Sequence, residues 1–190
     1  MILHTVFRLY PDYERTRGLL LDEASALHVL QRQRTGTGEI GRMASIWIAE
    51  EDVPLGDFPC GSGFAPILSR RVCMHFEREL RTAGEFIPVH AEGVEAGAYQ
   101  LYLVNSVIDC LDVKRSAKPK RATGQMTHLT FLPSRIDQSL PAFRIPQSPT
   151  FVFWNAAFVE ALQRFGANGL VPLVVWSEDH SIQPARAPMR

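Results

Sequence analysis

The chain has 190 residues, of which 46% are hydrophobic and 21% are charged, so it can bury a core as one domain or as two small lobes. Its 20 lysines and arginines balance 20 acidic residues, which excludes a global field that would attract nucleic acid or an acidic membrane surface. Any charged partner must therefore meet a local patch.

The cysteines and the amino terminus indicate a reducing compartment. Cys60, Cys73 and Cys110 cannot all pair with one another and lie in no CxxC spacing, which indicates neither a disulfide framework nor a zinc knuckle. Residues 1–15 lack the features of a secretory signal, and no segment approaches the run of about 18 apolar residues that a membrane span needs. We expect a soluble cytoplasmic protein without a membrane partner.

The first third of the chain alternates strand and helix signals. Residues 1–10 predict a strand, and Asp22 is the expected N-cap of a helix that ends in the glycine-rich run 35–41. Residues 43–49 predict a second strand, and residues 52–66 hold enough proline and glycine to predict a long irregular loop. The helix is predicted from the apolar stripe Leu20, Ala24, Leu27 and Leu30.

Two later segments, 66–92 and 148–176, share one order of strand, N-cap, apolar helical stripe, glycine and strand. The cap, stripe and glycine of the first are Ser69, Val72, Phe76, Leu80, Ala83 and Gly84. Those of the second are Asn155, Phe158, Ala161, Leu162, Phe165 and Gly166. The second strand of each segment contains a proline, Pro88 or Pro172, which favours a sheet edge or a bulge.

These patterns predict an α+β fold with a mixed sheet, on which two similar strand-helix-strand units pack their helices. Between the units, residues 98–112 and 125–137 each predict a strand, and they flank a basic loop. We expect residues 1–63 to form an amino-terminal lobe, residues 64–177 a core, and residues 178–190 an unstructured tail.

Motifs for the common enzyme classes are absent. The sequence holds no GxxxxGK[ST] phosphate loop, no HExxH pair and no GxSxG elbow. The run "GTGEIG" (36–41) follows a helix and precedes a strand, which is the reverse of a nucleotide-binding loop. No two of the six histidines share an i, i+4 spacing, so no metal site, cofactor or catalytic residue is predicted.

Two local features remain open to a functional interpretation. Asp109 and Asp112 are three residues apart, but at a strand end such a pair more often caps a turn than holds a metal or shares acid and base roles. The run "KRSAKPKR" (114–121) lacks the interleaved aromatic residues typical of nucleic-acid binding, so we favour a dock for an acidic protein over RNA, and a solvated loop stays an equal alternative. The candidate partner-binding residues are Lys114, Arg115, Lys118, Lys120 and Arg121.

Three segments together resemble the immunity-protein-eleven family, which accompanies polymorphic toxins in bacteria. The stretch 140–176 is similar to its carboxy-terminal signature, in which a Phe-Arg segment leads to a strand, an "F.EAL" helix, a "GL" stop and a last strand. Residues 67–80 resemble its other strand and helix, and residues 99–116 its central strand with a "DCLD" turn. The resemblance covers about 64–177, whereas the first sixty residues match less clearly.

The resemblance implies a protein that neutralises a cognate toxin or effector by binding it, without turning over a substrate. The family motif falls on packing and turn positions, so contacts with the toxin are expected on loops, first the basic loop and then residues 52–66. These motif positions are Phe143, Arg144, Phe158, Leu162, Gly166 and Gly169.

Two other classes of function stay open. An enzyme with an unrecognised site would bring together Asp109, Asp112 and His128, and a cleft holding carboxylates of perturbed pKa would favour it. A small nucleic-acid-binding regulator would use residues 114–121, and strong salt dependence of its binding to arbitrary DNA or RNA would favour that.

Overall fold

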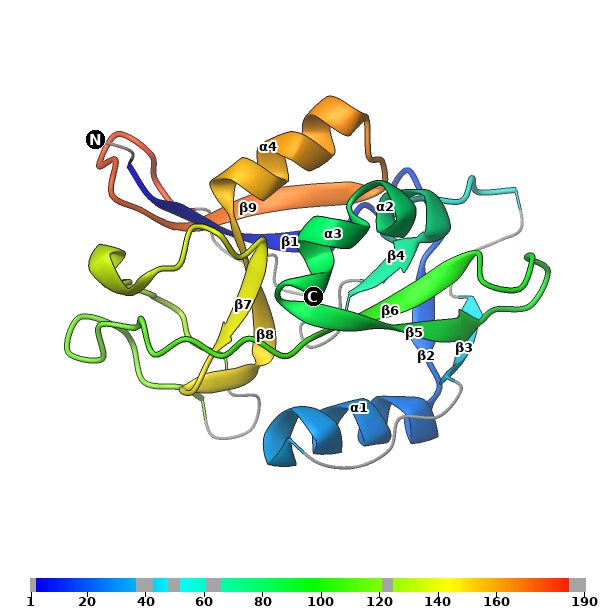
Figure 1. Ribbon diagram of the computed structural model, residues 1–190, viewed down its shortest axis with the longest axis horizontal. Coiled ribbons are helices and arrows are strands. Elements are labelled where there is room, and N and C mark those ends of the chain that lie inside the picture. The colour runs from blue at the N-terminus through cyan, green and yellow to red at the C-terminus, as the bar shows by residue number, and fades with distance from the viewer. Residues whose placement is uncertain (1–2, 37–42, 48–51, 61–65, 121–124, 185–190) are drawn as a thin grey trace.

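The computed structural model of the protein describes residues 3–36, 43–47, 52–60, 66–120 and 125–184. Within these ranges the strands form one sheet of four and one of five, and helices pack against both (Figure 1). The protein therefore has the α+β fold that the sequence predicts.

The four-stranded sheet is antiparallel and has the order β7-β8-β1-β9. Its strands are β1 (Thr5–Pro11), β7 (Ala142–Ile145), β8 (Ser148–Asn155) and β9 (Leu170–Ser177). The first strand of the chain thus lies between two strands from the carboxy-terminal part, and it pairs with both.

The five-stranded sheet has the order β2-β3-β5-β6-β4 and is mixed, because β3 and β5 run parallel while the other neighbours run antiparallel. Its strands are β2 (Leu19–Leu21), β3 (Met43–Trp47), β4 (Ile67–Ser69), β5 (Gly84–His90) and β6 (Tyr99–Val104). Each sheet draws strands from both sides of residue 63, so the expected boundary there does not separate two sheets.

The helices are α1 (Glu23–Thr35), α2 (Arg70–His75), α3 (Glu77–Arg81), α4 (Ala156–Phe165) and the 3-10 helix η1 (Pro133–Arg135). The three predicted N-caps are confirmed, since Asp22, Ser69 and Asn155 each accept a backbone N–H from the first turn. None of the helices in the described ranges has both the length and the apolar composition that crossing a membrane requires.

The two strand-helix-strand units are confirmed, and they share a topology that the sequence did not show. In the first, β4 leads through α2 and α3 to β5, and β6 lies between β4 and β5. In the second, β8 leads through α4 to β9, and β1 takes the place between them. Each unit is thus completed by an antiparallel strand from elsewhere in the chain.

The expected edge position is confirmed for Pro172 and is wrong for Pro88. Pro172 is on β9, which is an edge strand of its sheet. Pro88 is on the interior strand β5, where the described pairing with β3 joins Val89 to Met43 and His90 to Ala44.

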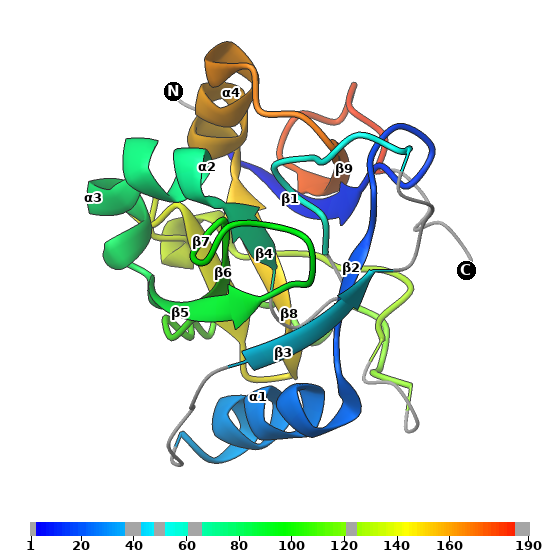
Figure 2. The same cartoon turned by 90° about the vertical axis from the view of Figure 1, so that its right-hand side faces the viewer.

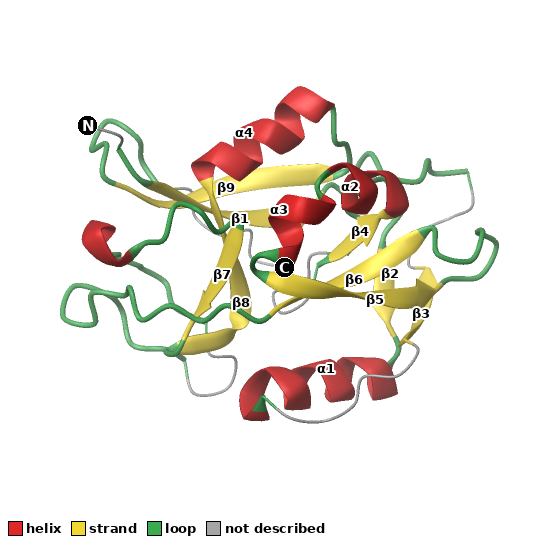
Figure 3. Cartoon of the chain, in the orientation of Figure 1, coloured by secondary structure: helices red, strands yellow, loops and turns green. Residues whose placement is uncertain are grey.

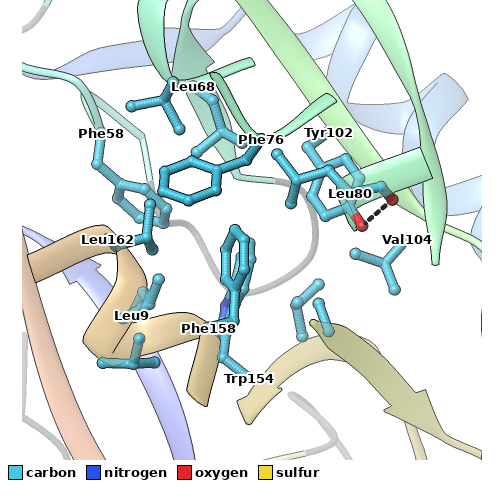
Figure 4. Close-up of a cluster of buried hydrophobic side chains, with 14 of the residues drawn as sticks. Leu9, Phe58, Leu68, Phe76, Leu80, Tyr102, Val104, Trp154, Phe158 and Leu162 are labelled. Atoms are coloured by element: carbon cyan, nitrogen blue, oxygen red, sulfur yellow. Dashed lines mark hydrogen bonds between the residues drawn. The ribbon is translucent and has the colours of Figure 1, made fainter. Parts of the chain in front are cut away.

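Apolar side chains form three clusters. The central cluster lies between the sheets beneath α2, α3 and α4, where Tyr102 also donates its hydroxyl to the carbonyl of Leu80 at 2.7 Å (Figure 4). A second cluster joins the other face of the five-stranded sheet to α1, which Figures 1 and 2 show on the opposite side of the molecule from α4. The third, the outer cluster, contains Val6, Cys110, Leu111, Leu129, Phe131, Ile136, Phe143, Ile145 and Phe153.

The remaining face of the four-stranded sheet packs against a segment that has little regular structure, and side chains from both form the outer cluster. Residues 105–141 connect β6 to β7 mostly as loop and turn, with η1 as the one short helix in the described part of this segment (Figure 3). The predicted strands 98–112 and 125–137 are therefore wrong in extent, because β6 ends at Val104 and 125–137 contributes a single bridge, between Phe131 and Leu111. Proline at 133 has no N–H to continue a ladder.

The predicted stripe of α1 is wrong. Leu20 belongs to β2, and Leu27 is 58% exposed. The buried residues of this helix are Ser25, Val29 and Gln33, spaced by four, so a largely polar face packs inward. The helix does end as expected, at Gly36 with a φ of 71°, and residues 37–42 lie outside the described ranges.

The predicted helix over 70–83 is confirmed in its buried stripe and corrected in its shape. It breaks at Phe76, whose φ of −107° and ψ of 23° separate α2 from α3, while Val72, Phe76, Leu80 and Ala83 are all buried. Gly84 does not stop the helix as predicted. It begins β5, and a Cβ added there would meet the carbonyl oxygen of Leu103 at 2.3 Å, so glycine is needed for close strand approach.

The carboxy-terminal residues expected to be an unstructured tail extend the β1-β9 pairing. Glu178 donates its N–H to the carbonyl of His4 and accepts the N–H of His4 through its side chain. Asp179 accepts from the backbone and hydroxyl of Ser181 in a local turn. Residues 185–190 lie outside the described ranges.

Truncation of the α4 stripe tests the central cluster. Phe158→Ala or Leu162→Ala is expected to lower the free energy of unfolding by about 2–5 kcal/mol, because each leaves a cavity among buried side chains. Urea unfolding of each variant measures the change. Met74→Ala, at a position 67% exposed on α2, is the control; unfolding free energies equal to the parent in both α4 variants would contradict this packing.

Candidate partner-binding surface

The basic loop is part of an arm, residues 111–131, whose described backbone is held by its own hydrogen bonds. At the base, the N–H of Asp112 donates to the carbonyl of Thr130 at 2.8 Å. Farther out, the N–H of Ala117 donates to the carbonyl of His128 at 2.9 Å, and the N–H of Lys120 to that of Gln125 at 2.9 Å. The cations are thus carried on an ordered support.

The arm presents its cations to solvent. Of the five predicted partner-binding residues, Lys114, Arg115, Lys118 and Lys120 are exposed, and within the described part of the chain none of them forms an ion pair. Arg121 lies outside the described residues. Every lysine of the protein is in this arm, since the sequence contains lysine only at 114, 118 and 120.

The base of the arm is fixed to the outer cluster. Leu111 is 4% exposed and Phe131 is 2% exposed, and the ring of Phe131 lies 5.7 Å from that of Trp176 on β9 and 5.4 Å from that of Phe153 on β8. These contacts hold the exposed cations at a fixed place beside the four-stranded sheet.

The two aspartates at the start of the arm make local contacts. Asp112 accepts the backbone N–H groups of Lys114 and Arg115, at 3.1 and 3.2 Å, so it caps the turn as the structural interpretation predicts. Asp109 is exposed, accepts the side-chain amide of Gln147 at 3.0 Å and lies 3.9 Å from the guanidinium of Arg135.

Neither the histidines nor the cysteines form a metal-binding group in the described residues. His128, the third residue of the alternative enzyme site, hydrogen bonds to the hydroxyl of Thr130 at 3.2 Å. All three cysteines are free and buried. Burial raises the pKa of Cys73 and of Cys110 to about 12, so both thiols stay protonated and pack as small apolar groups.

Residues 52–60, the second candidate loop, differ from the expectation of an exposed binding loop. The segment 56–60 is buried, and Asp57, 4% exposed, is its polar centre. The Asp57 carboxylate accepts the hydroxyl of Ser69 at 2.5 Å, Nε of Arg71 at 2.7 Å and the N–H of Asn168 at 2.9 Å. Residues 61–65 lie outside the described ranges.

Asp57 joins the two strand-helix-strand units. Ser69 is the N-cap of α2 and Asn168 follows the end of α4, so one carboxylate links the start of one unit's helix to the end of the other's. Burial opposes its ionisation, but the hydrogen bonds from Arg71, Ser69 and Asn168 outweigh burial and lower the pKa of Asp57.

The glycines after α4 allow this junction to close. Gly166 ends the helix with a φ of 73°, and its carbonyl accepts a bond from Arg71. Gly169 has a φ of 70°, and a Cβ there would meet the hydroxyl oxygen of Thr16 at 2.7 Å. Both positions therefore act as turns, as the sequence predicts.

Arg144 is a buried cation, which the interpretation as a packing position missed. It is 6% exposed, while its neighbour Phe143 is fully buried in the outer cluster. Its guanidinium donates to the backbone carbonyls of Val104 at 2.7 Å, Pro149 at 2.9 Å and Gln33 at 3.1 Å. Burial lowers the pKa of this guanidinium, but arginine remains protonated in proteins.

An open groove of about 220 Å³ lies between α3, the start of α4 and residues 138–141. Its lining includes the apolar side chains of Phe76 and Phe158 and the polar side chains of Glu79 and Gln138. Neither the cations of the arm nor the residues of the alternative enzyme site line it.

Comparison of the chain with protein-family models and with curated proteins finds no match to either. The site is therefore interpreted from its own geometry.

No local motif in the sequence marks Asp57 or Arg144 as the centre of a polar network. The partners of Asp57 are 12, 14 and 111 residues away, and two of the carbonyls that Arg144 binds are 40 and 111 residues away. Those separations are set by the fold, so only the tertiary structure brings these groups together.

The Asp57 junction predicts a dependence of stability on pH. Because the folded state lowers the pKa of Asp57, its contribution is complete above the unfolded value of about 4 and is lost as the pH falls through the folded value. Asp57→Asn should therefore be less stable than the parent at neutral pH, and the gap should narrow as the medium becomes acidic. Urea unfolding across that range measures both, and a gap that stays constant with pH would contradict the ionised junction.

Removal of the buried guanidinium of Arg144 is expected to destabilise the protein strongly. Arg144→Met should lower the free energy of unfolding by about 3 kcal/mol or more, because hydrogen bonds to charged groups contribute about 1.5–3 kcal/mol each and the freed carbonyls stay buried. Arg164→Met, at a side chain 74% exposed on α4, is the matched control and should change it by under about 1 kcal/mol. Equal losses in the two variants would refute the role of Arg144.

Proposed function

We propose that the protein is a cytoplasmic immunity protein that binds a cognate toxin or effector protein and neutralises it. The observation that carries the proposal is the basic arm, whose four described cations are exposed, unpaired within the described chain and held on an ordered backbone. The resemblance of residues 64–177 to an immunity-protein family supplies the class of partner.

The charge of the arm favours an acidic protein surface as its target. The protein has no net charge overall, and residues 111–131 hold five cations and one carboxylate, so the arm is a local positive patch on a chain whose remaining residues are negative in sum. Such a patch accelerates association with a negative partner and contributes less to the lifetime of the complex. Neutralisation by binding requires a stable fold that places this patch, and it requires no cofactor and no metal.

Nucleic acid fits the arm less well than protein does. Single-stranded nucleic acid is held by aromatic side chains that stack on bases, in addition to cations. Residues 112–130 contain no phenylalanine, tyrosine or tryptophan, and the neighbouring Phe131 is buried in the outer cluster.

Binding kinetics with a candidate cognate effector test the proposal. Replacing Lys114, Lys118 and Lys120 with serine should lower the association rate and flatten its dependence on salt, because these charges steer the encounter. Folding stability should change by under about 1 kcal/mol per residue, because exposed charges contribute little to it. Surface-plasmon measurements at two ionic strengths, with the effector immobilised, give the rates.

The matched control removes three exposed arginines from helices away from the arm, Arg70, Arg78 and Arg164, and it leaves the arm intact. It should associate faster than the lysine variant at low salt. Association of the lysine variant at the parental rate would place the effector elsewhere on the molecule. Failure of the parent to bind the effector, or to restore growth of cells that express it, would overturn the function itself.

A further inference from the structure

Arg8 lies at the centre of the four-stranded sheet, on the face that carries the arm. Along β1, Phe7 and Leu9 pack in the central cluster while Val6 packs in the outer cluster. Because side chains alternate along a strand, Arg8 projects to the same side as Val6. A cation therefore stands in the middle of the outer face, beside the cluster that anchors the arm.

Two aromatic rings hold the guanidinium of Arg8. Its central carbon lies 4.1 Å from the centre of the Phe151 ring and 4.9 Å from that of Tyr10. All three side chains are half-buried. This arrangement fixes the position of the planar group by cation–π contact, so little side-chain freedom remains to be lost when a ligand binds.

The guanidinium has no anion to bind within the described chain. It forms no ion pair and no hydrogen bond with any described residue. Burial lowers the pKa of Arg8, and the nearby Tyr10 partly offsets that effect, but the group remains charged. A partly desolvated charge without a counter-charge is costly, and an anion supplied from outside would remove that cost.

Arg8 and the arm both lie beside the outer cluster. Phe151, which stacks on Arg8, packs against the outer cluster, and Phe131 at the base of the arm is a member of that cluster. The Arg8 guanidinium and the base of the arm are therefore fixed to the same side of the four-stranded sheet.

We propose that Arg8 is the anchor of the effector interface and binds a carboxylate side chain of the effector through a bidentate pair of hydrogen bonds. The proposal rests on the function proposed above. A planar guanidinium matches a carboxylate with two parallel hydrogen bonds, and the acidic surface that the arm attracts supplies such groups. The arm then sets the rate of association and Arg8 the lifetime of the complex, as expected of a half-buried arginine at the middle of an interface.

The binding chemistry is tested on the protein alone, with acetate as the probe. The parent protein, labelled with ¹⁵N, is titrated with sodium acetate against sodium chloride at constant ionic strength, and the Nε–H signals of its arginines are followed. Arg8 should show a saturable shift that Arg15, whose side chain is 85% exposed, does not show. Equal, unsaturated shifts at both arginines would overturn the site, and stronger binding of inorganic phosphate than of acetate would overturn its assignment to a carboxylate.

The role in the interface is tested by dissociation kinetics with the same immobilised effector. Arg8→Lys keeps the charge and loses the planar fork, and it should raise the dissociation rate by at least about tenfold while association changes by less than about twofold. Arg15→Lys is the matched control and should leave both rates at the parental values. A parental dissociation rate in a folded Arg8→Lys protein would overturn the anchor.

The two experiments separate failure of the site from failure of the function. If acetate binds Arg8 but the effector does not bind the parent protein, the function is wrong and so is Arg8's assignment to the effector interface. If the effector binds but Arg8→Lys dissociates at the parental rate, the function stands and the anchor lies elsewhere.

Discussion

The arrangement of the two sheets depends on a buried positive charge, the guanidinium of Arg144. Arg144 makes no ion pair in the described structure, and three backbone carbonyls from β6, α1 and the start of β8 surround its guanidinium. The carbonyl of Gln33 belongs to the last turn of α1, where helix carbonyls lack helical partners and a cation is favoured. One side chain thereby ties the end of the five-stranded sheet to the edge of the four-stranded sheet and to the helix beneath.

Asp57 provides a second tie, of opposite charge, between the two strand-helix-strand units. The central cluster packs between these polar contacts, and α2, α3 and α4 press against it. Buried charges of this kind add less to the free energy of unfolding than their number of hydrogen bonds suggests, because burying a charge costs desolvation free energy. Any alternative arrangement that leaves such a charge buried and unpaired is, however, strongly destabilised. These penalties favour a single well-defined arrangement of the fold, which the proposed binding function would need.

The sequence predicts local features well where one residue type has one strong structural preference. The caps at Asp22, Ser69 and Asn155, the stripe of Val72, Phe76 and Leu80, and the turn at Gly166 follow from short-range rules, and the structure confirms them. Errors occur where tertiary contacts decide. The face of α1 that packs inward is mostly polar, and Cys110, Leu111 and Phe131 are buried without belonging to a strand. Arg8, Asp57 and Arg144 owe their surroundings to residues distant in sequence. The basic loop within the arm can be predicted from the sequence, because a cluster of charged residues that are close in sequence is visible without knowledge of the fold.

The distribution of lysines gives the molecule a chemical handle. Apart from the amino terminus, its primary amines are confined to the arm, because every other cationic side chain except histidine is an arginine. An amine-directed label or cross-linker would therefore attach at the face proposed for the effector and leave the helices and the opposite face unmodified. Coupling the protein to a solid support through amines would hide that face, whereas a thiol-directed reagent would meet only buried cysteines.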